Sequence, residues 1–266
     1  LLVLALAYVA PATARTVTDS AGRSVDIPAD VTRVYAAGPP ASILLYVLAP
    51  DRLTGWPRPP RSEERPYIAA PYRDLPATGR LTGRGDTANL EVVLRDRPDL
   101  IVDFGSVRDT YVSLADRVQA QTGIPYLLID GRFEATPAAL RLLGEVLGVE
   151  PRAEALARYV ESLFAELEAG LAEIPVDDRP RVYFARGPDG LETGLKGSIN
   201  TEIIELAGGR NVADPGDAAI RRGITDVSIE QVIVANPDTI ITWDRNFYQS
   251  VWNDPLWSQI PALTEG

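Results

Sequence analysis

The chain contains no cysteine and no histidine among its 266 residues. Without cysteine it can form no disulfide bond and can use no thiolate, either as a nucleophile or as a metal ligand. Without histidine it lacks the commonest general base and the commonest metal ligand in proteins. A Ser–His–Asp triad and a histidine-ligated zinc site are therefore excluded, and direct capture of a bare divalent metal ion is disfavoured.

Positive charge is also scarce. Lysine and arginine number 26 against 37 aspartate and glutamate residues, which gives a formal net charge of −11 and a pI of about 4.6. This balance argues against nucleic acid or an anionic membrane as the main partner. Hydrophobic residues make up 45% of the chain, which is ample for the core of one large domain or of two smaller ones.

Long hydrophobic runs are missing except at the N-terminus. Residues 1–10 form an apolar run, and Ala12-Thr13-Ala14 follows it as an A-x-A cleavage site. Because the run is too short to span a bilayer, we interpret residues 1–14 as the remnant of a secretory signal peptide that lacks its basic start. A buried first strand is the alternative. The signal predicts an exported, periplasmic or extracytoplasmic protein that begins at Arg15.

The most informative feature that is present is a segment that occurs twice. Residues 89–102 read N-L-E-V-V-L-R-D-R-P-D-L-I-V, and residues 228–241 read S-I-E-Q-V-I-V-A-N-P-D-T-I-I. Two copies so far apart predict two similar lobes rather than a short-period solenoid. The identical pairs are Glu91 and Glu230, Val93 and Val232, Pro98 and Pro237, Asp99 and Asp238, and Ile101 and Ile240.

Each copy has the pattern of a helix, a turn and a strand. Asn89 and Ser228 are predicted N-caps, and Ser228 with Gln231 matches a capping box. The Pro-Asp pair then ends each helix, because the residue before a proline avoids the right-handed helical region. The β-branched runs at 100–102 and 239–242 are expected to be buried strands of parallel sheets.

The rest of the first half alternates predicted strands and helices, which indicates a doubly wound parallel sheet. Residues 57–86 form a long irregular loop rich in proline, arginine and glycine, and loops of this length are more often functional than not. The predicted strands cover 33–37, 53–56 and 125–130, and the predicted helices begin at Ser42 or cover 107–122 and 136–147.

A long helical pattern over 151–174 separates the two halves, and we interpret it as a rigid connector. The second half predicts a strand at 181–186, a helix at 199–207 capped by Ser198, and a short helix at 254–260. Because this half offers about three strands against four in the first, we interpret the C-terminal lobe as incomplete. The predicted organisation is an N-terminal α/β lobe at 15–148, a linker helix at 149–176 and a C-terminal α/β lobe at 177–266.

The order of these motifs resembles the substrate-binding proteins of the ABC importers for iron-siderophores, haem and cobalamin. Residues 18–28 resemble the N-terminal hairpin of that family, and Arg33-Val34 resembles the start of its first strand. The two copies of the repeat match its duplicated signature. Residues 197–212 match its G-S…E…G-G-x-N segment. The order and spacing of these motifs, rather than any one of them, carry the resemblance.

The resemblance implies two Rossmann-like α/β lobes with parallel sheets, joined by one long helix, with the ligand in the cleft between them. It also implies that one glutamate on each lobe docks onto arginines of the membrane permease, and the matching positions are Glu91 and Glu230. The start of such a helix lies at the carboxyl edge of a parallel sheet, which is the ligand edge, and two separated carboxylates there can set a docking register. The alternative is that each glutamate only complements its helix dipole, worth about 0.3–1 kcal/mol.

Ligand contacts are expected from loops that follow strands. An iron chelate often carries anionic groups and aromatic or apolar faces, which suit the planar donors of arginine and the rings of tryptophan and tyrosine. Arg84 and Arg222 are favoured because they hold matching places before the two copies of the repeat. The alternative to ligand binding is core packing for Trp243 and simple exposure to solvent for each arginine. The candidate ligand-binding residues are Trp56, Arg58, Arg84, Arg186, Arg221, Arg222, Trp243 and Tyr248.

These inferences predict a monomeric solute-binding protein, not an enzyme, that delivers a ferric siderophore to an ABC importer permease. We expect no catalytic residue, no resident metal and no cofactor, although Tyr67, Tyr72 or Tyr248 could ligate ferric iron or haem. A cobalamin or haem binder of the same class is one alternative. An exported enzyme on a two-lobe scaffold is another, although no G-x-G-x-x-G loop follows a strand. The rigid connector predicts only a small movement of the lobes on binding.

Overall fold

The computed structural model describes residues 14–82, 90–195, 198–213 and 223–264. The chain divides into two compact units, Leu1–Arg158 and Tyr159–Gly266. The division falls within α5 (Glu150–Leu171), the long helix of the predicted connector. The lobe boundaries predicted at 148 and 176 stay predictions. No helix in the described ranges is both long and apolar enough to cross a bilayer.

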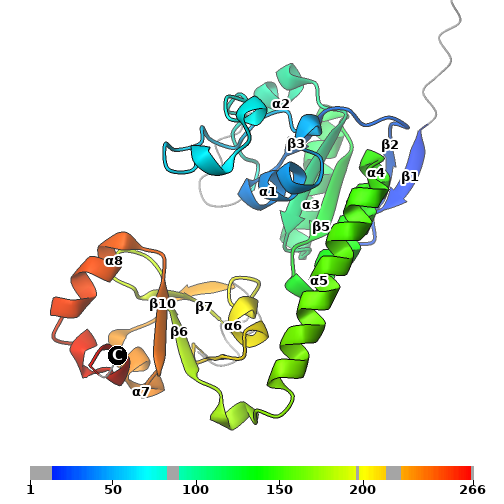
Figure 1. Ribbon diagram of the computed structural model, residues 1–266. Coiled ribbons are helices and arrows are strands. Elements are labelled where there is room, and N and C mark those ends of the chain that lie inside the picture. The colour runs from blue at the N-terminus through cyan, green and yellow to red at the C-terminus, as the bar shows by residue number, and fades with distance from the viewer. Residues whose placement is uncertain (1–13, 83–89, 196–197, 214–222, 265–266) are drawn as a thin grey trace, which may run out of the picture. The chain divides into compact units, whose positions relative to one another are not determined.

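Unit 1 alternates strands and helices in the order that the sequence predicts (Figure 1). Its elements before α5 are β1 (Arg15–Thr18), β2 (Ser24–Ile27), β3 (Val34–Ala36), α1 (Pro39–Leu48), α2 (Leu90–Asp96), β4 (Leu100–Gly105), α3 (Asp109–Thr122), β5 (Tyr126–Asp130) and α4 (Thr136–Leu147).

The main sheet of unit 1 is parallel, with the strand order β3-β4-β5. An isolated parallel bridge joins Val34 of β3 to Leu53 on the side away from β4. Successive strands are therefore added on opposite sides of β3. In open α/β sheets ligands bind at the carboxyl edge beside such a reversal, so the loops after β3 and β4 face the expected ligand edge.

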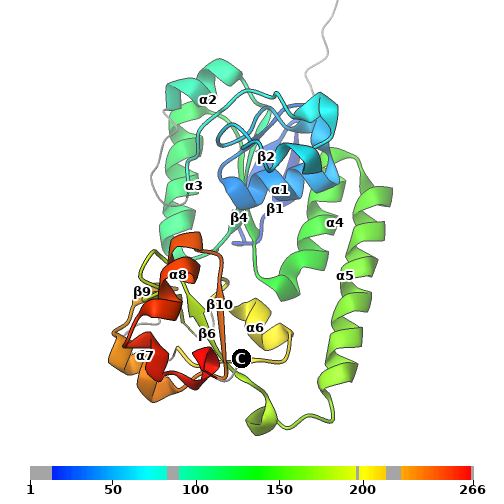
Figure 2. The same cartoon turned by 60° about the vertical axis from the view of Figure 1, so that its left-hand side comes forward.

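Helices cover both faces of this sheet. Val93 of α2 and Val118 of α3 pack with Tyr35 and Ile101 in one buried cluster. Figure 2 shows α4 on the opposite side of the strands from α3. The sheet is thus buried on both faces, as the nearly uninterrupted apolar sequence of β4 and β5 requires.

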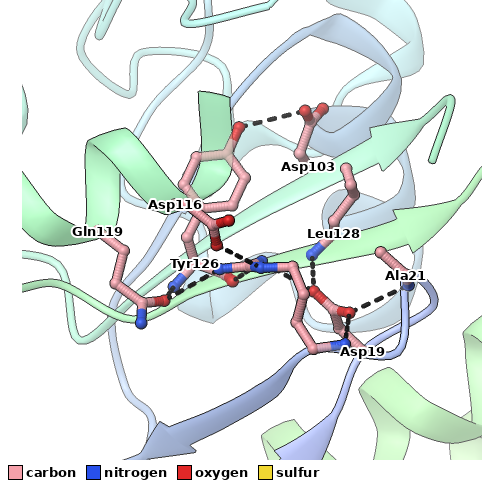
Figure 3. A network of polar contacts seen from close by, with 8 residues as sticks. Asp19, Ala21, Asp103, Asp116, Gln119, Tyr126 and Leu128 are labelled. Atoms are coloured by element: carbon pink, nitrogen blue, oxygen red, sulfur yellow. Dashed lines mark hydrogen bonds and ion pairs between the residues drawn. The ribbon is translucent and has the colours of Figure 1, made fainter. Parts of the chain in front are cut away.

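The predicted N-terminal hairpin is formed by β1 and β2, which pair antiparallel. A buried polar network ties its turn to β5 (Figure 3). The Asp19 carboxylate, with none of its side chain exposed, accepts hydrogen bonds from the backbone N–H groups of Ala21, Arg23 and Leu128. The Arg23 guanidinium pairs with Asp19 at 2.9 Å and donates to the Tyr126 carbonyl at 2.9 Å. The buried charge of Asp19 is therefore compensated within the network.

Unit 2 repeats the strand–helix alternation on a smaller scale (Figure 1). Its elements after α5 are β6 (Arg181–Ala185), β7 (Glu192–Gly194), α6 (Glu202–Leu206), β8 (Arg210–Asn211), β9 (Ile224–Asp226), α7 (Ile229–Ala235), β10 (Thr239–Thr242) and α8 (Arg245–Ser250).

The parallel sheet of unit 2 has the order β10-β6-β8, so β6 is its central strand. Side chains of β6 alternate between two cores. Tyr183 packs with Val232 of α7, and Phe184 packs with Ile204 of α6. A second, antiparallel sheet of β7 and β9 was not predicted, because three-residue strands carry too short a pattern.

Both copies of the repeat have the predicted helix–turn–strand structure. The capping box of α7 is confirmed: Ser228 accepts from the backbone of Gln231 at 3.3 Å, and the Gln231 side chain accepts from the backbone of Ser228 at 2.8 Å. The other predicted N-cap, Asn89, lies outside the described residues. Before each proline, Arg97 and Asn236 adopt positive φ angles of 48° and 45°, which ends the helices as the prolines predict.

Some predicted boundaries were wrong. Helix α1 begins at Pro39 rather than Ser42, because prolines suit the first helical positions, where no N–H is needed. Helix α6 begins at Glu202, and Ser198 does not cap it. The Ser198 hydroxyl instead accepts hydrogen bonds from the backbone and side chain of Asn200 in a preceding turn.

Two predicted elements are reduced to fragments. The strand expected at 53–56 consists of single bridges, because Leu53 pairs with Val34 whereas Trp56 pairs with Ala77, so no continuous ladder forms. The helix expected at 254–260 is a short 3-10 turn at Trp257–Gln259. The predicted signal segment lies outside the described residues apart from Ala14.

Candidate functional site

The predicted Arg186 and Trp243 come together at the carboxyl edge of the unit 2 sheet. Arg186 follows β6 and Trp243 follows β10, and these strands pair in register at Ala185 and Thr242. The Arg186 guanidinium carbon lies 4.8 Å from the centroid of the Trp243 ring. The Trp243 ring meets Phe184 edge-on at 4.7 Å and is 67% exposed. The result is a solvent-facing aromatic plate with a guanidinium over it.

The charge of Arg186 is held by a neighbouring carboxylate. Its Nε lies 3.3 Å from Oε1 of Glu192, and both side chains are largely buried. Backbone hydrogen bonds of 2.7 and 3.1 Å also join the two residues, and Nη1 donates to Asn200 at 3.4 Å. The turn between β6 and β7 therefore fixes the arginine in place over the tryptophan.

Tyr248 lies one turn into α8, which Asp244 caps through hydrogen bonds to the N–H groups of Asn246 and Phe247. Its ring is 58% exposed and contacts Trp252 edge-on at 6.1 Å. Tyr248 thus belongs to a second exposed aromatic pair on α8 and the turn after it, rather than to the Arg186–Trp243 stack.

In unit 1, a pocket of about 490 Å³ lies along the exposed side of α1 and the loop at 56–68. Trp56 forms part of its wall. Only 5% of the Trp56 surface is exposed, its Nε1 donates to the Tyr72 carbonyl at 2.8 Å, and its ring lies 5.5 Å from that of Tyr46. The Tyr46 ring and the Tyr72 carbonyl thus cover much of Trp56, and its role as a ligand contact in this pocket stays a prediction.

The rim of this pocket carries Arg58 and the 86% exposed Tyr67. The Arg58 guanidinium donates to both carboxylate oxygens of Glu64, and Glu64 also accepts from the backbone N–H of Arg61. These hydrogen bonds lower the pKa of Glu64 to about 2. The pocket is otherwise lined by Pro39, Ser42, Ile43, Tyr46, Val47, Trp56, Pro57, Pro60, Glu63 and Ile68.

A charged cluster that was not predicted lies at the end of β5. Arg132 donates hydrogen bonds to the Asp130 carboxylate from Nε and Nη2, at 2.9 and 2.7 Å, and from Nη1 to the Glu134 carboxylate at 2.6 Å. Burial raises the pKa of Asp130, but the hydrogen bonds from Arg132 outweigh burial and leave the pKa below its ordinary value. The Asp-Gly-Arg sequence after an apolar strand was the signal that could have revealed this cluster.

The predicted docking glutamates occupy equivalent places. Glu91 and Glu230 lie in the first turns of α2 and α7, and both are exposed. A hydrogen bond with the Ser228 side chain lowers the pKa of Glu230, which keeps its carboxylate ionised at neutral pH. The predicted contacts Arg84, Arg221 and Arg222 lie outside the described residues.

No group of three or more aspartate or glutamate side chains within the described ranges is arranged to hold a metal ion. What the described loops do present at the two carboxyl edges are aromatic rings, apolar side chains and arginines held by carboxylates. Such surfaces suit a ligand with flat or apolar faces.

The sequence profile of the periplasmic binding protein family matches residues 42–266. The solved structure of an ABC transporter solute binding protein from Sulfurospirillum deleyianum is similar, with a TM-score of 0.81 and 29% identity, covering 94% of this chain and 78% of that one.

Curated relatives match over shorter stretches. The molybdate-binding protein MolA of Haemophilus influenzae is 31% identical over 128 residues, which cover 47% of this chain and 35% of the relative. The vitamin B12-binding protein of Salmonella typhi is 28% identical over 185 residues, which cover 68% of this chain and 65% of the relative. The chain therefore spans only about a third to two thirds of the length of these relatives.

Proposed function

Because its residues 42–266 match the family profile, the chain belongs to the periplasmic binding protein family, and we propose that it is the extracytoplasmic solute-binding protein of an ABC importer. It binds a ferric siderophore and delivers it to a membrane permease. On this proposal it is a carrier and not an enzyme, and it needs no cofactor of its own.

The choice of ligand class rests on the cluster formed by Arg186, Trp243 and Phe184. An exposed tryptophan beneath a fixed guanidinium offers a broad, flat contact for the organic part of a metal chelate. The pocket of unit 1 adds an apolar and aromatic surface of about 490 Å³. A bare oxyanion would instead require a compact set of hydrogen-bond donors. That the ligand lies between the two lobes stays a prediction from the family resemblance.

A cobalamin or haem is the alternative ligand, and the relative named as a vitamin B12-binding protein favours the first of these. Both offer a planar macrocycle to the same aromatic surfaces. The relative named as a molybdate-binding protein makes molybdate a third ligand worth testing, although the described surfaces suit it less well.

The proposed partner is the permease, and the proposed contacts are Glu91 and Glu230. Each is an exposed carboxylate in the first turn of an equivalent helix, one in each unit. Arginines on a partner would form charge-assisted hydrogen bonds with such carboxylates and fix the register of docking.

Intrinsic tryptophan fluorescence tests the ligand class. The chain has four tryptophans, of which Trp243 and Trp252 are well exposed while Trp56 and Trp257 are buried. We expect saturable quenching at micromolar or lower concentration by a ferric siderophore, and a much smaller change in the Trp243→Phe variant. Calorimetric titration with the same ligands provides the affinity independently of the optical signal. No binding of any ferric chelate, haem, cobalamin or molybdate by either method would refute the proposal.

A further inference from the structure

The arginines that border the aromatic surfaces of both units are already paired with carboxylates of their own loops. From this pairing we propose that the described part of the ligand site selects chelates of low net charge, such as ferric trihydroxamates, over strongly anionic ones, such as ferric tricatecholates. Three singly charged hydroxamates cancel the charge of ferric iron, whereas three doubly charged catecholates leave a trianion. This inference rests on the proposed function and narrows its ligand class.

The Arg186–Glu192 pair is more buried than the Arg58–Glu64 pair. Their side chains are 16% and 15% exposed, and they are locked together by the two backbone hydrogen bonds that begin the β7 hairpin. An incoming anion that draws this guanidinium away would break its contact with the largely buried Glu192 carboxylate, which is costly. The planar face of Arg186 over Trp243 serves as a stacking surface, while its charge is largely cancelled.

The pocket of unit 1 repeats the arrangement. Arg58 donates two hydrogen bonds to Glu64, and Glu63 also lines the pocket. Arg61, next to the pocket, also interacts with Glu63 and Glu64, so two arginines and two carboxylates balance one another here. Because the Arg58 hydrogen bonds lower the pKa of Glu64 to about 2, the carboxylate stays ionised at any physiological pH. These four residues consequently offer no net positive charge that would attract a multiply charged anion.

The cluster of Asp130, Arg132 and Glu134 at the end of β5 has a net negative charge. Arg132 is shared between Asp130 and Glu134, so this part of the carboxyl edge also carries one more negative than positive charge. The whole chain adds a formal net charge of −11. Arg245, at the start of α8, is exposed, so solvent and salt screen its attraction for an anion.

Two carboxylates are the proposed determinants of charge selectivity, and their isosteric amide variants test the idea. Glu192→Gln and Glu64→Gln keep the size and backbone contacts of the side chains but release the arginine charge. In calorimetric titrations, a ferric trihydroxamate, a ferric tricatecholate and molybdate would each be titrated into the unmodified protein and into each variant, and their affinities compared. Glu168→Gln, an exposed change on α5, is the matched control.

For the unmodified protein we expect the trihydroxamate to bind at least about tenfold more tightly than the tricatecholate. Glu192→Gln should reduce this ratio by roughly tenfold, and Glu64→Gln should reduce it by a smaller factor, because Glu64 is more exposed and better screened. Glu168→Gln should leave the ratio unchanged, and Arg245→Gln should change it by no more than about twofold.

The outcomes separate this inference from the function on which it rests. Tighter binding of the tricatecholate by the unmodified protein, a ratio that both glutamate variants leave unchanged, or a ratio that depends on Arg245 would overturn the charge inference while leaving a chelate-binding protein. Binding of molybdate but of no chelate, or of no probe at all, would overturn both.

Discussion

Asp238 accepts a hydrogen bond from the backbone N–H of Arg181 at 2.7 Å and also holds the Arg181 guanidinium through both carboxylate oxygens. Its counterpart in the other copy of the repeat, Asp99, accepts from the backbone N–H of Arg33 at 2.9 Å. Each aspartate also donates its own N–H to the carbonyl of the same arginine, at 2.8 Å in both units. The duplicated Pro-Asp turn thus holds the start of β3 in unit 1 and of β6 in unit 2.

The first prediction concerns the Asp238→Asn variant. Hydrogen bonds from the Arg181 side chain and backbone lower the pKa of Asp238 to about 2. Because the folded pKa lies below the unfolded value of about 4, the stability that this carboxylate contributes is present above pH 4 and is lost as the pH falls towards 2. The variant should be less stable by about 1 kcal/mol at pH 7, and this difference should shrink below pH 4.

Urea unfolding at pH 7 and at pH 2.5 measures this difference in unfolding free energy. Asp177→Asn is the control, because Asp177 is 97% exposed and its contact with Arg210, at 3.3 Å, lies on the surface. A difference between the Asp238 variant and the unmodified protein that is equally large at both pH values would show that the charge of Asp238 plays no part.

Local sequence signals were sufficient to predict the repeat, but not the details of the site. The capping box at Ser228 and the Pro-Asp turns depend on residues within a few positions, so their structure follows from the sequence pattern. The pairing of Arg186 with Glu192 depends on the β7 hairpin, whose three-residue strands carry no readable period. The burial of Trp56 depends on Tyr72, sixteen residues away, which no local pattern reveals.

The second prediction concerns the buried network of Asp19. In an Asp19→Asn variant, the amide replaces an acceptor that receives three backbone N–H groups, and it leaves Arg23 with only the exposed Asp116 as an ion-pair partner. We expect a loss of about 3 kcal/mol in unfolding free energy, because the three N–H groups lose a charged acceptor and the buried ion pair between Asp19 and Arg23 is broken. Amide hydrogen exchange should show the largest loss of protection at Leu128 and in the β1–β2 hairpin.

The exposed Asp26→Asn variant, in the same hairpin, is the matched control. Equal losses in the two variants would indicate that the hairpin tolerates any change of charge equally, and would contradict a specific role for the buried Asp19 network.

The third prediction concerns Gly190, in the turn that positions Arg186. Gly190 has a φ of +70°, and an added Cβ would lie 2.3 Å from the ring of the buried Phe247. Gly190→Ala should therefore cost about 2–4 kcal/mol, since it combines backbone strain with a clash in the core of unit 2. Gly123→Ala isolates the strain, because Gly123 has a φ of +71° but open space around it, and it should cost only about 1–2 kcal/mol.

Scanning calorimetry of the two glycine variants, with Gly170→Ala as an unstrained helical control, distinguishes the two contributions. Equal destabilisation by Gly190→Ala and Gly123→Ala would mean that the ring of Phe247 moves aside freely.

The last prediction concerns docking to the proposed permease. Glu91 and Glu230 are exposed residues on equivalent helices, so replacing both by alanine removes two carboxylates without creating a cavity. Glu91→Ala with Glu230→Ala should abolish ligand uptake by vesicles that contain the permease, while calorimetry shows an unchanged affinity for the ligand. Each single variant should reduce uptake in part, because one charge-assisted contact remains on the other unit. Glu168→Ala, an equally exposed change on α5, should leave uptake intact. If ligand affinity instead falls in step with uptake, the two glutamates belong to the pocket or to the stability of their helices, and the matched positions of the repeat would reflect its fold rather than a shared docking role.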